Sequence, residues 1–123
     1  MIYGTGIDII EVERVKKKIE KPGFLEKAFT PYEIEYCQSK FNKAEHFAAR
    51  FAAKEAFLKA LGTGWQGEFP SEDLGIVSNE LGKPKFQFGE SLKKILAERG
   101  IVNCHVSLSH VKEMAVASVI LEK

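Results

Sequence analysis

The sequence contains 123 residues, 45% of them hydrophobic and 28% charged, which fits one soluble globular domain spanning residues 1–123. A chain of this length can bury a single core but has little surplus for a second. Its 18 basic and 17 acidic side chains leave a net charge of +1, so a global attraction to nucleic acid is not expected and any basic patch must be local.

Cysteine usage and the length of the apolar runs indicate the cellular compartment. Cys37 and Cys104 lie far apart without a CxxC spacing, so the sequence predicts neither a disulfide framework nor a zinc knuckle. The N-terminus lacks a basic segment followed by a long apolar run, and no apolar run reaches membrane-spanning length. We therefore expect a cytoplasmic protein that does not enter a membrane.

The N-terminal segment 2–10 is predicted to be a strand because its residues alternate in character. Gly4, Gly6 and Asp8 share one face of it, which leaves a bare strip of backbone beside a carboxylate. Such a strip allows close approach by a ligand or by another strand. The simpler interpretation is that Asp8 caps a helix or a turn near the end of the strand.

A helix is predicted from Glu11 to Lys21, where Pro22 and Gly23 end it. Its apolar residues form one inward stripe, and its outer face carries the clearest charge asymmetry in the chain. This basic face is either simply solvated or a docking site for an acidic partner. The predicted docking residues are Arg14, Lys17, Lys18 and Lys21.

Two further helices are predicted before the middle of the chain. Thr30 and Glu33 form a capping box with Pro31 at the first helical position, so a helix is expected up to about Ser39. The segment 47–62, FAARFAAKEAFLKALG, is expected to be a longer helix that is apolar almost all the way round. Phenylalanine and leucine form one stripe of it, and alanine forms a face where another backbone can approach closely.

Four charged residues, Arg50, Lys54, Glu55 and Lys59, lie within this nearly apolar helix. Charges in such surroundings are costly unless they are paired or bound to a ligand. One interpretation is an i, i+4 ion pair between Glu55 and Lys59, with Arg50 and Lys54 extending from a packed face into water. The other is a binding site in which Glu55 supplies a metal ligand and the three cations meet phosphate.

The C-terminal half is predicted to be mostly strand. Gly62, Gly64 and Gly67 follow the long helix, and C-capping accounts for the first of them. The last strand is apolar on both faces, so it should be central in a sheet or buried in a subunit interface. These elements predict an α+β fold with a mostly antiparallel sheet and a long central helix. Strands are expected at 74–78, 84–88, 102–110 and 114–121, with a short helix ending at Gly100.

Asp8 and Glu55 could together supply the one or two carboxylates that a magnesium site commonly uses. Phosphoryl transfer around such a metal asks the protein mainly for positioning and charge stabilisation. Zinc is less favoured, because His105 and His110 fall on opposite faces of one strand. Suitable polar donors are Arg50, Lys54, Lys59, His105, Ser107 and Ser109.

Four segments resemble the 4'-phosphopantetheinyl transferases. They are GIDIIEVERV at 6–15, FAAKEAFLK at 51–59, GKPKF at 82–86 and VSLSH at 106–110. Each segment is short, but four of them in one small chain make a specific match that covers essentially the whole sequence. Their order and the chain length resemble the small acyl-carrier-protein synthase type, which implies one transferase domain over residues 1–123.

The resemblance implies transfer of the phosphopantetheine arm of coenzyme A to a serine hydroxyl of apo acyl carrier protein, releasing adenosine 3',5'-bisphosphate, in fatty acid biosynthesis. It implies that Asp8 and Glu55 bind Mg2+ with the coenzyme A pyrophosphate. Lys59 would neutralise charge on the transferring phosphate or protonate the leaving group. Glu55 and a metal-bound water both remain candidates for the general base. The coenzyme A site would include Arg50, Lys54, Gly82, Lys83, Pro84, His105 and Ser109.

The order of the four segments also bears on assembly. Larger members of the family carry the GKP and SHS segments before the GID and KEA segments, and here that order is reversed. The resemblance therefore implies a homotrimer whose active sites lie between neighbouring subunits, and the apolar last strand and the alanine face point to a buried contact. Acyl carrier proteins are acidic, which would give the basic helix its partner.

Two other functions use the same residues. A magnesium-dependent hydrolase of a nucleotide pyrophosphate would need the carboxylates and cations but no protein acceptor. A non-catalytic module that binds coenzyme A or a nucleotide would need only the cations. Neither alternative accounts for the basic helix as directly as transfer to an acidic carrier protein does.

Overall fold

The computed structural model describes residues 1–64 and 68–123, so the predicted glycine at position 67 lies outside the described residues. Helices and strands follow one another as an α+β fold, which confirms the predicted fold class. The order is β1 (Ile2–Glu11), α1 (Val12–Ile19), α2 (Phe24–Ala28), α3 (Pro31–Gln38), α4 (Lys43–Leu61), the 3-10 helix η1 (Ser71–Asp73), β2 (Leu74–Ser78), β3 (Pro84–Phe88), α5 (Glu90–Glu98), β4 (Asn103–His110) and β5 (Met114–Glu122).

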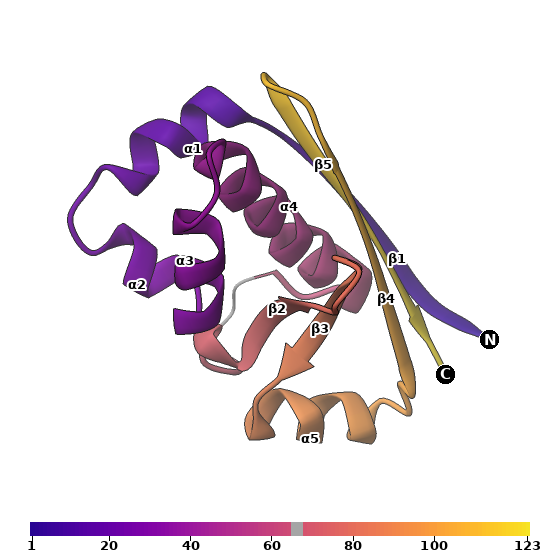
Figure 1. Cartoon of the computed structure of the whole chain (residues 1–123). Helices are drawn as coiled ribbons and strands as arrows, with labels where there is room; N and C mark the ends of the chain where they lie inside the picture. Colours follow the sequence, from indigo (N-terminus) through magenta and orange to yellow (C-terminus); the bar gives the residue numbers. More distant parts are fainter. Residues whose placement is uncertain (65–67) are drawn as a thin grey trace.

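The main sheet is antiparallel and has the strand order β1-β5-β4, with β2 and β3 forming a separate antiparallel pair. β5 is the central strand, as its apolar pattern predicts. Its alternate residues Ala115, Ala117, Val119 and Leu121 are buried on the inner face of the sheet. The long helix α4 lies across that face (Figure 1).

Gly4 and Gly6 allow β1 to lie directly against the backbone of α4. A Cβ atom on Gly6 would stand 1.9 Å from the carbonyl oxygen of Ala56, and one on Gly4 would stand 2.1 Å from that of Ala60. The predicted close approach therefore occurs, and the approaching element is a helix of the same chain, where the sequence had suggested a ligand or another strand. The alanine face is filled within the chain, so it does not support a subunit contact.

Helix boundaries differ from the predicted ones by up to four residues, and α5 ends at Glu98, two residues before the predicted Gly100. α1 ends at Ile19, two residues before the predicted Lys21, and α4 begins at Lys43, four residues before the predicted start at Phe47. The five-residue helix α2 was not predicted, because it is too short to show a helical period. The capping box before α3 is confirmed, since Thr30 Oγ1 accepts from the backbone N–H of Glu33 at 3.2 Å.

The outer face of the main sheet is partly apolar and carries no helix of the chain (Figure 1). Ile7 and Ile9 on β1 are each 64% exposed, and Ile120 on β5 is 39% exposed. An exposed apolar face of this kind is typical of a surface that another chain covers. Among residues 1–64 and 68–123, no helix has the length and apolar character that a membrane span requires.

Candidate active site

Asp8 and Lys59 meet between β1 and α4. Lys59 Nζ donates to Asp8 Oδ1 at 3.2 Å and to the carbonyl oxygen of Ile7 at 3.0 Å. The Asp8 side chain is 18% exposed and the Lys59 side chain 58% exposed, so the pair lies at the surface of the chain and is open to a ligand. The ion pair of Lys59 with Asp8 therefore joins α4 to β1. The simpler interpretation had predicted a pair with Glu55 within the helix.

Glu55 lies one turn before Lys59 on the same side of α4 and is half-buried. Since Gly4 meets Ala60 and Gly6 meets Ala56, the next residue on that face of β1, Asp8, is level with the turn around Ala52, and Glu55 lies between that turn and Lys59. The structure thus pairs Asp8 with Lys59 across the β1–α4 contact, and Glu55 lies one turn from Lys59 on the same side of α4. Asp8 lies near the helix despite the long sequence separation, because Gly4 and Gly6 let β1 pack directly against α4.

The Asp8 and Glu55 carboxylates form a donor set that suits Mg2+, which needs few protein ligands and completes its octahedron with water and phosphate oxygens. Within the described part of the chain, no group of three or more His, Cys, Asp or Glu side chains is arranged to hold a metal ion. A closed structural zinc site, which takes four protein ligands, does not fit that arrangement. The residues present fit a magnesium ion that is shared with a phosphate substrate.

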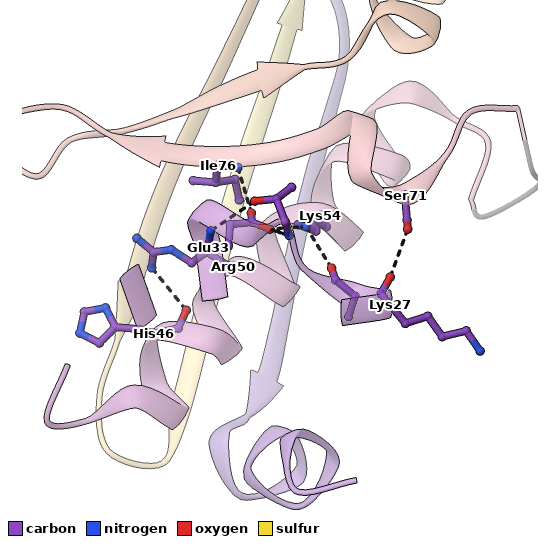
Figure 2. Close-up of polar contacts among 9 residues, drawn as sticks. Lys27, Glu33, His46, Arg50, Lys54, Ser71 and Ile76 are labelled. Carbon is purple, nitrogen blue, oxygen red and sulfur yellow. Dashed lines mark hydrogen bonds and ion pairs between the residues drawn. The ribbon is translucent and has the colours of Figure 1, made fainter. Parts of the chain in front are cut away.

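Lys54 occupies a different environment from its neighbours on α4. Its Nζ donates to Glu33 Oε1 at 2.6 Å and to the carbonyl oxygen of Ala28 at 3.0 Å, and the residue is only 2% exposed (Figure 2). Burial lowers the pKa of Lys54, and the Glu33 carboxylate opposes this change. Removing one partner of such a buried pair typically costs about 3–5 kcal/mol. The structure therefore gives Lys54 an internal partner in place of the predicted phosphate contact.

Arg50 is 4% exposed and has only weak hydrogen bonds. Its Nη1 donates to the carbonyl oxygen of His46 at 3.3 Å and its Nη2 donates to Ser78 Oγ at 3.5 Å, and its Nε–H has no partner among the residues that the structure describes. The guanidinium stands over the Tyr36 ring at 4.5 Å. Because Ser78 pairs with Pro84, the last pair before the turn, Arg50 lies near the turn end of the β2–β3 hairpin.

The hairpin turn presents the predicted Gly82, Lys83 and Pro84 segment to solvent. Asn79 Oδ1 accepts from the backbone N–H groups of Leu81 and Lys83, each at 2.9 Å, which fixes the turn. Gly82 has φ +82°, a conformation that favours glycine. Lys83 is exposed at the turn. Arg50 is linked to the GKP segment through Ser78, which pairs with Pro84, and a shared coenzyme A site there stays a prediction.

His105 and Ser109 lie elsewhere, on the outer face of the main sheet. His105 Nε2 is 2.6 Å from Glu122 Oε1, and both His105 and Ser109 are exposed. α4 covers the opposite face of the same sheet (Figure 1). One chain therefore does not unite these two residues with Arg50, Asp8 or Glu55.

The basic face of α1 remains largely available to a partner. Arg14, Lys17 and Lys21 are exposed. Lys18 is half-buried, with its Nζ 5.2 Å from the centre of the Phe51 ring. Three of the four predicted docking residues thus project into solvent, and the fourth packs partly against α4.

Sequence reasoning missed the histidine pair beside Arg50. His110 Nδ1 is 2.8 Å from Glu45 Oε1, and the His46 and His110 ring centres are 4.9 Å apart. Burial, with nearby Arg50 and His110, lowers the pKa of His46 to about 4. The only sequence signal was the VSLSH segment, because Glu45 and His46 lay before the predicted start of the long helix.

Comparison with known proteins adds to this geometry. The family model of the 4'-phosphopantetheinyl transferase superfamily matches residues 4–117. A protein of Geotalea daltonii named holo-[acyl-carrier-protein] synthase is 46% identical over 125 residues, and the alignment covers 100% of both chains. The solved structure of the Neisseria meningitidis holo-[acyl-carrier-protein] synthase has a TM-score of 0.91 and 39% identity, with 100% of both chains covered.

A further solved structure, the Helicobacter pylori holo-[acyl-carrier-protein] synthase in complex with coenzyme A, has a TM-score of 0.83 and 32% identity, with 96% of this chain and 99% of that chain covered. The likeness therefore extends over nearly the full length of each protein. Together with the family model, it shows that the chain belongs to the 4'-phosphopantetheinyl transferase superfamily.

Proposed function

We propose that this chain transfers the 4'-phosphopantetheine group of coenzyme A to a serine hydroxyl of apo acyl carrier protein in a magnesium-dependent reaction. The products are holo acyl carrier protein and adenosine 3',5'-bisphosphate. The observation that carries the proposal is the ion pair of Asp8 with Lys59 across the β1–α4 contact, with Glu55 one helical turn from Lys59. The full-length similarity to proteins named holo-[acyl-carrier-protein] synthase supports it.

The three side chains divide the work of the reaction. Asp8 and Glu55 hold Mg2+, which supplies charge stabilisation to the pyrophosphate. Within the part of the chain that the structure describes, Lys59 Nζ uses two of its three N–H donors on Asp8 and Ile7, and the third can neutralise the transferring phosphate or protonate the leaving oxygen. The hydrogen bond to the Ile7 carbonyl, a group of the strand backbone, fixes the direction of that remaining donor.

The proposed coenzyme A site uses Arg50 and Lys83 as its cations. Arg50 offers an unpaired Nε–H, and Lys83 is exposed on the hairpin turn beside it. Together with Gly82 and Pro84 they receive one part of coenzyme A, and His105 and Ser109 receive another. Lys54 is left out of this site, because Glu33 and Ala28 already engage it.

The site is completed between subunits of a homotrimer. Two groups of residues support this step: His105 and Ser109 lie on the outer sheet face, whereas Asp8 and Glu55 lie at the β1–α4 contact on the inner side. A neighbouring chain that covers the exposed outer face can bring the two groups together. Ile7 and Ile9 supply the apolar part of that contact.

The acidic carrier protein docks on the basic face of α1. Arg14, Lys17 and Lys21 are exposed there, and Lys18 lies beside them. We place the reaction in the cytoplasm, because Cys37 and Cys104 are free thiols of the kind that a reducing compartment preserves. Its place in fatty acid biosynthesis follows from the similarity to proteins named holo-[acyl-carrier-protein] synthase.

A Glu55→Gln variant tests the metal assignment. Glutamine keeps the size of the side chain and removes the charged oxygen ligand, so transfer with magnesium should fall at least about 100-fold, within the range seen when charge-stabilising groups are removed. Turnover is measured from the mass of the carrier protein, and the circular dichroism spectrum should be unchanged. Near wild-type turnover would show that Glu55 is not a metal ligand.

The same reaction mixtures separate the two rival functions. A nucleotide pyrophosphate hydrolase would consume coenzyme A when the carrier protein is omitted or when its acceptor serine is replaced by alanine. A binding module would retain coenzyme A without forming any product. Transfer predicts that product forms only when coenzyme A, magnesium and the serine hydroxyl are all present.

A further inference from the structure

Glu33 joins three elements through one buried carboxylate. Its Oε1 accepts from Lys54 Nζ on α4 at 2.6 Å and from the backbone N–H of Thr30, the cap of α3, at 2.7 Å. Its Oε2 accepts from the backbone N–H of Ile76 on β2 at 2.9 Å. Glu33 is completely buried (Figure 2). The relative placement of α3, α4 and β2 therefore depends on this side chain.

The same three elements surround the Arg50 guanidinium. α3 contributes the Tyr36 ring below it, α4 contributes the carbonyl oxygen of His46, and β2 contributes Ser78 Oγ. Tyr36 lies one turn beyond Glu33 on α3, Arg50 one turn before Lys54 on α4, and Ser78 two residues beyond Ile76 on β2. The contacts of Glu33 and those of Arg50 are thus made by the same three elements, α3, α4 and β2, at neighbouring positions along them.

Lys54 and Arg50 differ in whether a carboxylate neutralises their charge. Lys54 has a carboxylate partner at 2.6 Å. Arg50, in the part of the chain that the structure describes, forms no ion pair, and its Nε–H is buried without an acceptor. A buried cation in this condition is costly unless an anion binds to it. Glu33 neutralises Lys54, whereas Arg50 can bind an anion from outside the chain.

We propose that Glu33 is a positioning residue that holds the Arg50 guanidinium in place for a phosphate group of coenzyme A. The inference rests on the proposed function, because it assigns Arg50 to the coenzyme A site. Glu33 touches no substrate and acts by fixing the ring, the helix turn and the strand that aim Arg50. Its pairing with Lys54 keeps a second cation from competing for the same phosphate.

A double-mutant cycle between Glu33 and Arg50 tests this role. The probe is adenosine 3',5'-bisphosphate, and its Kd is measured by isothermal titration calorimetry on the full chain. Glu33→Gln should weaken binding about tenfold in the wild-type background, as coupled contacts commonly do, and should have no further effect when Arg50 is already alanine. Equal, additive effects in both backgrounds would overturn the proposal.

A second variant guards against a loss of folding. Glu33→Gln with Lys54→Met replaces both members of the ion pair by neutral groups of similar size, so no buried charge remains unpaired. This double variant should also bind the bisphosphate more weakly than wild type, because the carboxylate bonds to Thr30 and Ile76 are weakened. Wild-type affinity in the double variant would overturn the positioning role.

Kinetics and a matched control complete the test. Glu33→Gln should raise KM for coenzyme A and leave kcat within about twofold, because the reacting groups are untouched. Asp73→Asn weakens a comparable carboxylate bond to the backbone N–H of Leu92, away from Arg50, and should lower stability without changing the Kd. If the wild-type protein does not bind the bisphosphate, the proposed function fails. If Arg50→Ala weakens binding and Glu33→Gln does not, only the positioning role fails.

Discussion

At the scale of single residues, the chain treats its similar charges in three ways. Lys54 is buried and paired with Glu33, and Lys59 is exposed with its amine held by Asp8. Arg50 is buried and has no carboxylate partner among residues 1–64 and 68–123. These states follow from where each residue lies around α4. The proposed chemistry uses the latter two, because a cation that is already satisfied in the interior has little to offer a phosphate.

His46 gives a prediction about pH and stability. Its folded-state pKa of about 4 lies below the ordinary value of 6.5, because burial and the cations Arg50 and Lys40, with His110, disfavour the charged ring, although Glu45 opposes them. Between pH 6.5 and 4 the unfolded chain binds a proton that the folded protein excludes, so the free energy of unfolding falls as the pH drops through this window. Urea denaturation of wild type and His46→Gln at pH 7.5 and pH 5 measures this contribution.

His46→Gln should lose less stability than wild type on acidification, since glutamine does not titrate. Below about pH 4 the two proteins should depend on pH to the same extent, because His46 is then protonated in both states. Identical losses of stability between pH 7.5 and pH 5 would show that His46 does not exclude a proton in the folded protein.

At the scale of elements, α1 separates its tasks by face. Val12 and Val15 are buried against the core, whereas Arg14 and Lys17 project into solvent, as does Lys21 two residues beyond the end of the helix. Exposed charges of this kind add little to stability but strongly affect how fast an oppositely charged protein associates. The face is therefore better explained by an acidic partner than by a contribution to the fold.

Reversing the charges of Arg14 and Lys17 to glutamate should raise KM for the carrier protein about tenfold or more at low salt, and should leave KM for coenzyme A nearly unchanged. Steady-state kinetics with each substrate varied in turn measures both constants. Lys93→Glu with Lys94→Glu on α5 is the matched control, because these residues are also exposed. Equal changes in both Michaelis constants, or the same change in the control, would refute docking on α1.

Much of the element pattern is predictable from local chemistry. The Thr30–Glu33 capping box correctly places the start of α3, and the two-sided apolar character of β5 correctly places it at the centre of the sheet. The helix α2 was missed, because five residues show no period and its start depends on Gly23 with φ +82°. Local sequence signals therefore predict the longer helices and strands more reliably than a helix of five residues.

The internal partners of the charged residues were less accessible from sequence. Glu33 had a complete explanation as a capping residue, so nothing indicated that it also binds Lys54, 21 residues away. The contact of Asp8 with Lys59 spans 51 residues, and the sequence assigned both residues to one site without indicating that they pair. Pairings of this kind depend on how β1 packs on α4, which periodicity does not specify.

At the scale of the whole molecule, the main sheet separates two groups of proposed site residues. Asp8, Glu55 and Arg50 belong to the α4 side, and His105 and Ser109 lie on the outer face. The outer face also exposes apolar side chains that water solvates poorly. We therefore propose that a neighbouring subunit covers the apolar face and, by the same contact, completes the coenzyme A site.

Ile9→Glu places a charge in the middle of the proposed subunit contact. The native mass of the wild-type protein should correspond to three chains of 13.8 kDa, and the variant should sediment as a monomer that keeps its circular dichroism spectrum but loses transfer activity. Val111→Glu is the control, because Val111 is 63% exposed in the turn between β4 and β5. A variant that is monomeric and fully active would show that the sites do not need a neighbouring subunit.

The mass of the acyl carrier protein after incubation with this chain, coenzyme A and magnesium tests the central claim most directly. The account predicts that each apo carrier molecule gains the mass of one 4'-phosphopantetheine group, and that a carrier whose acceptor serine is alanine gains nothing. An unchanged carrier mass with every divalent metal tested would contradict the account, whether or not coenzyme A is bound or consumed.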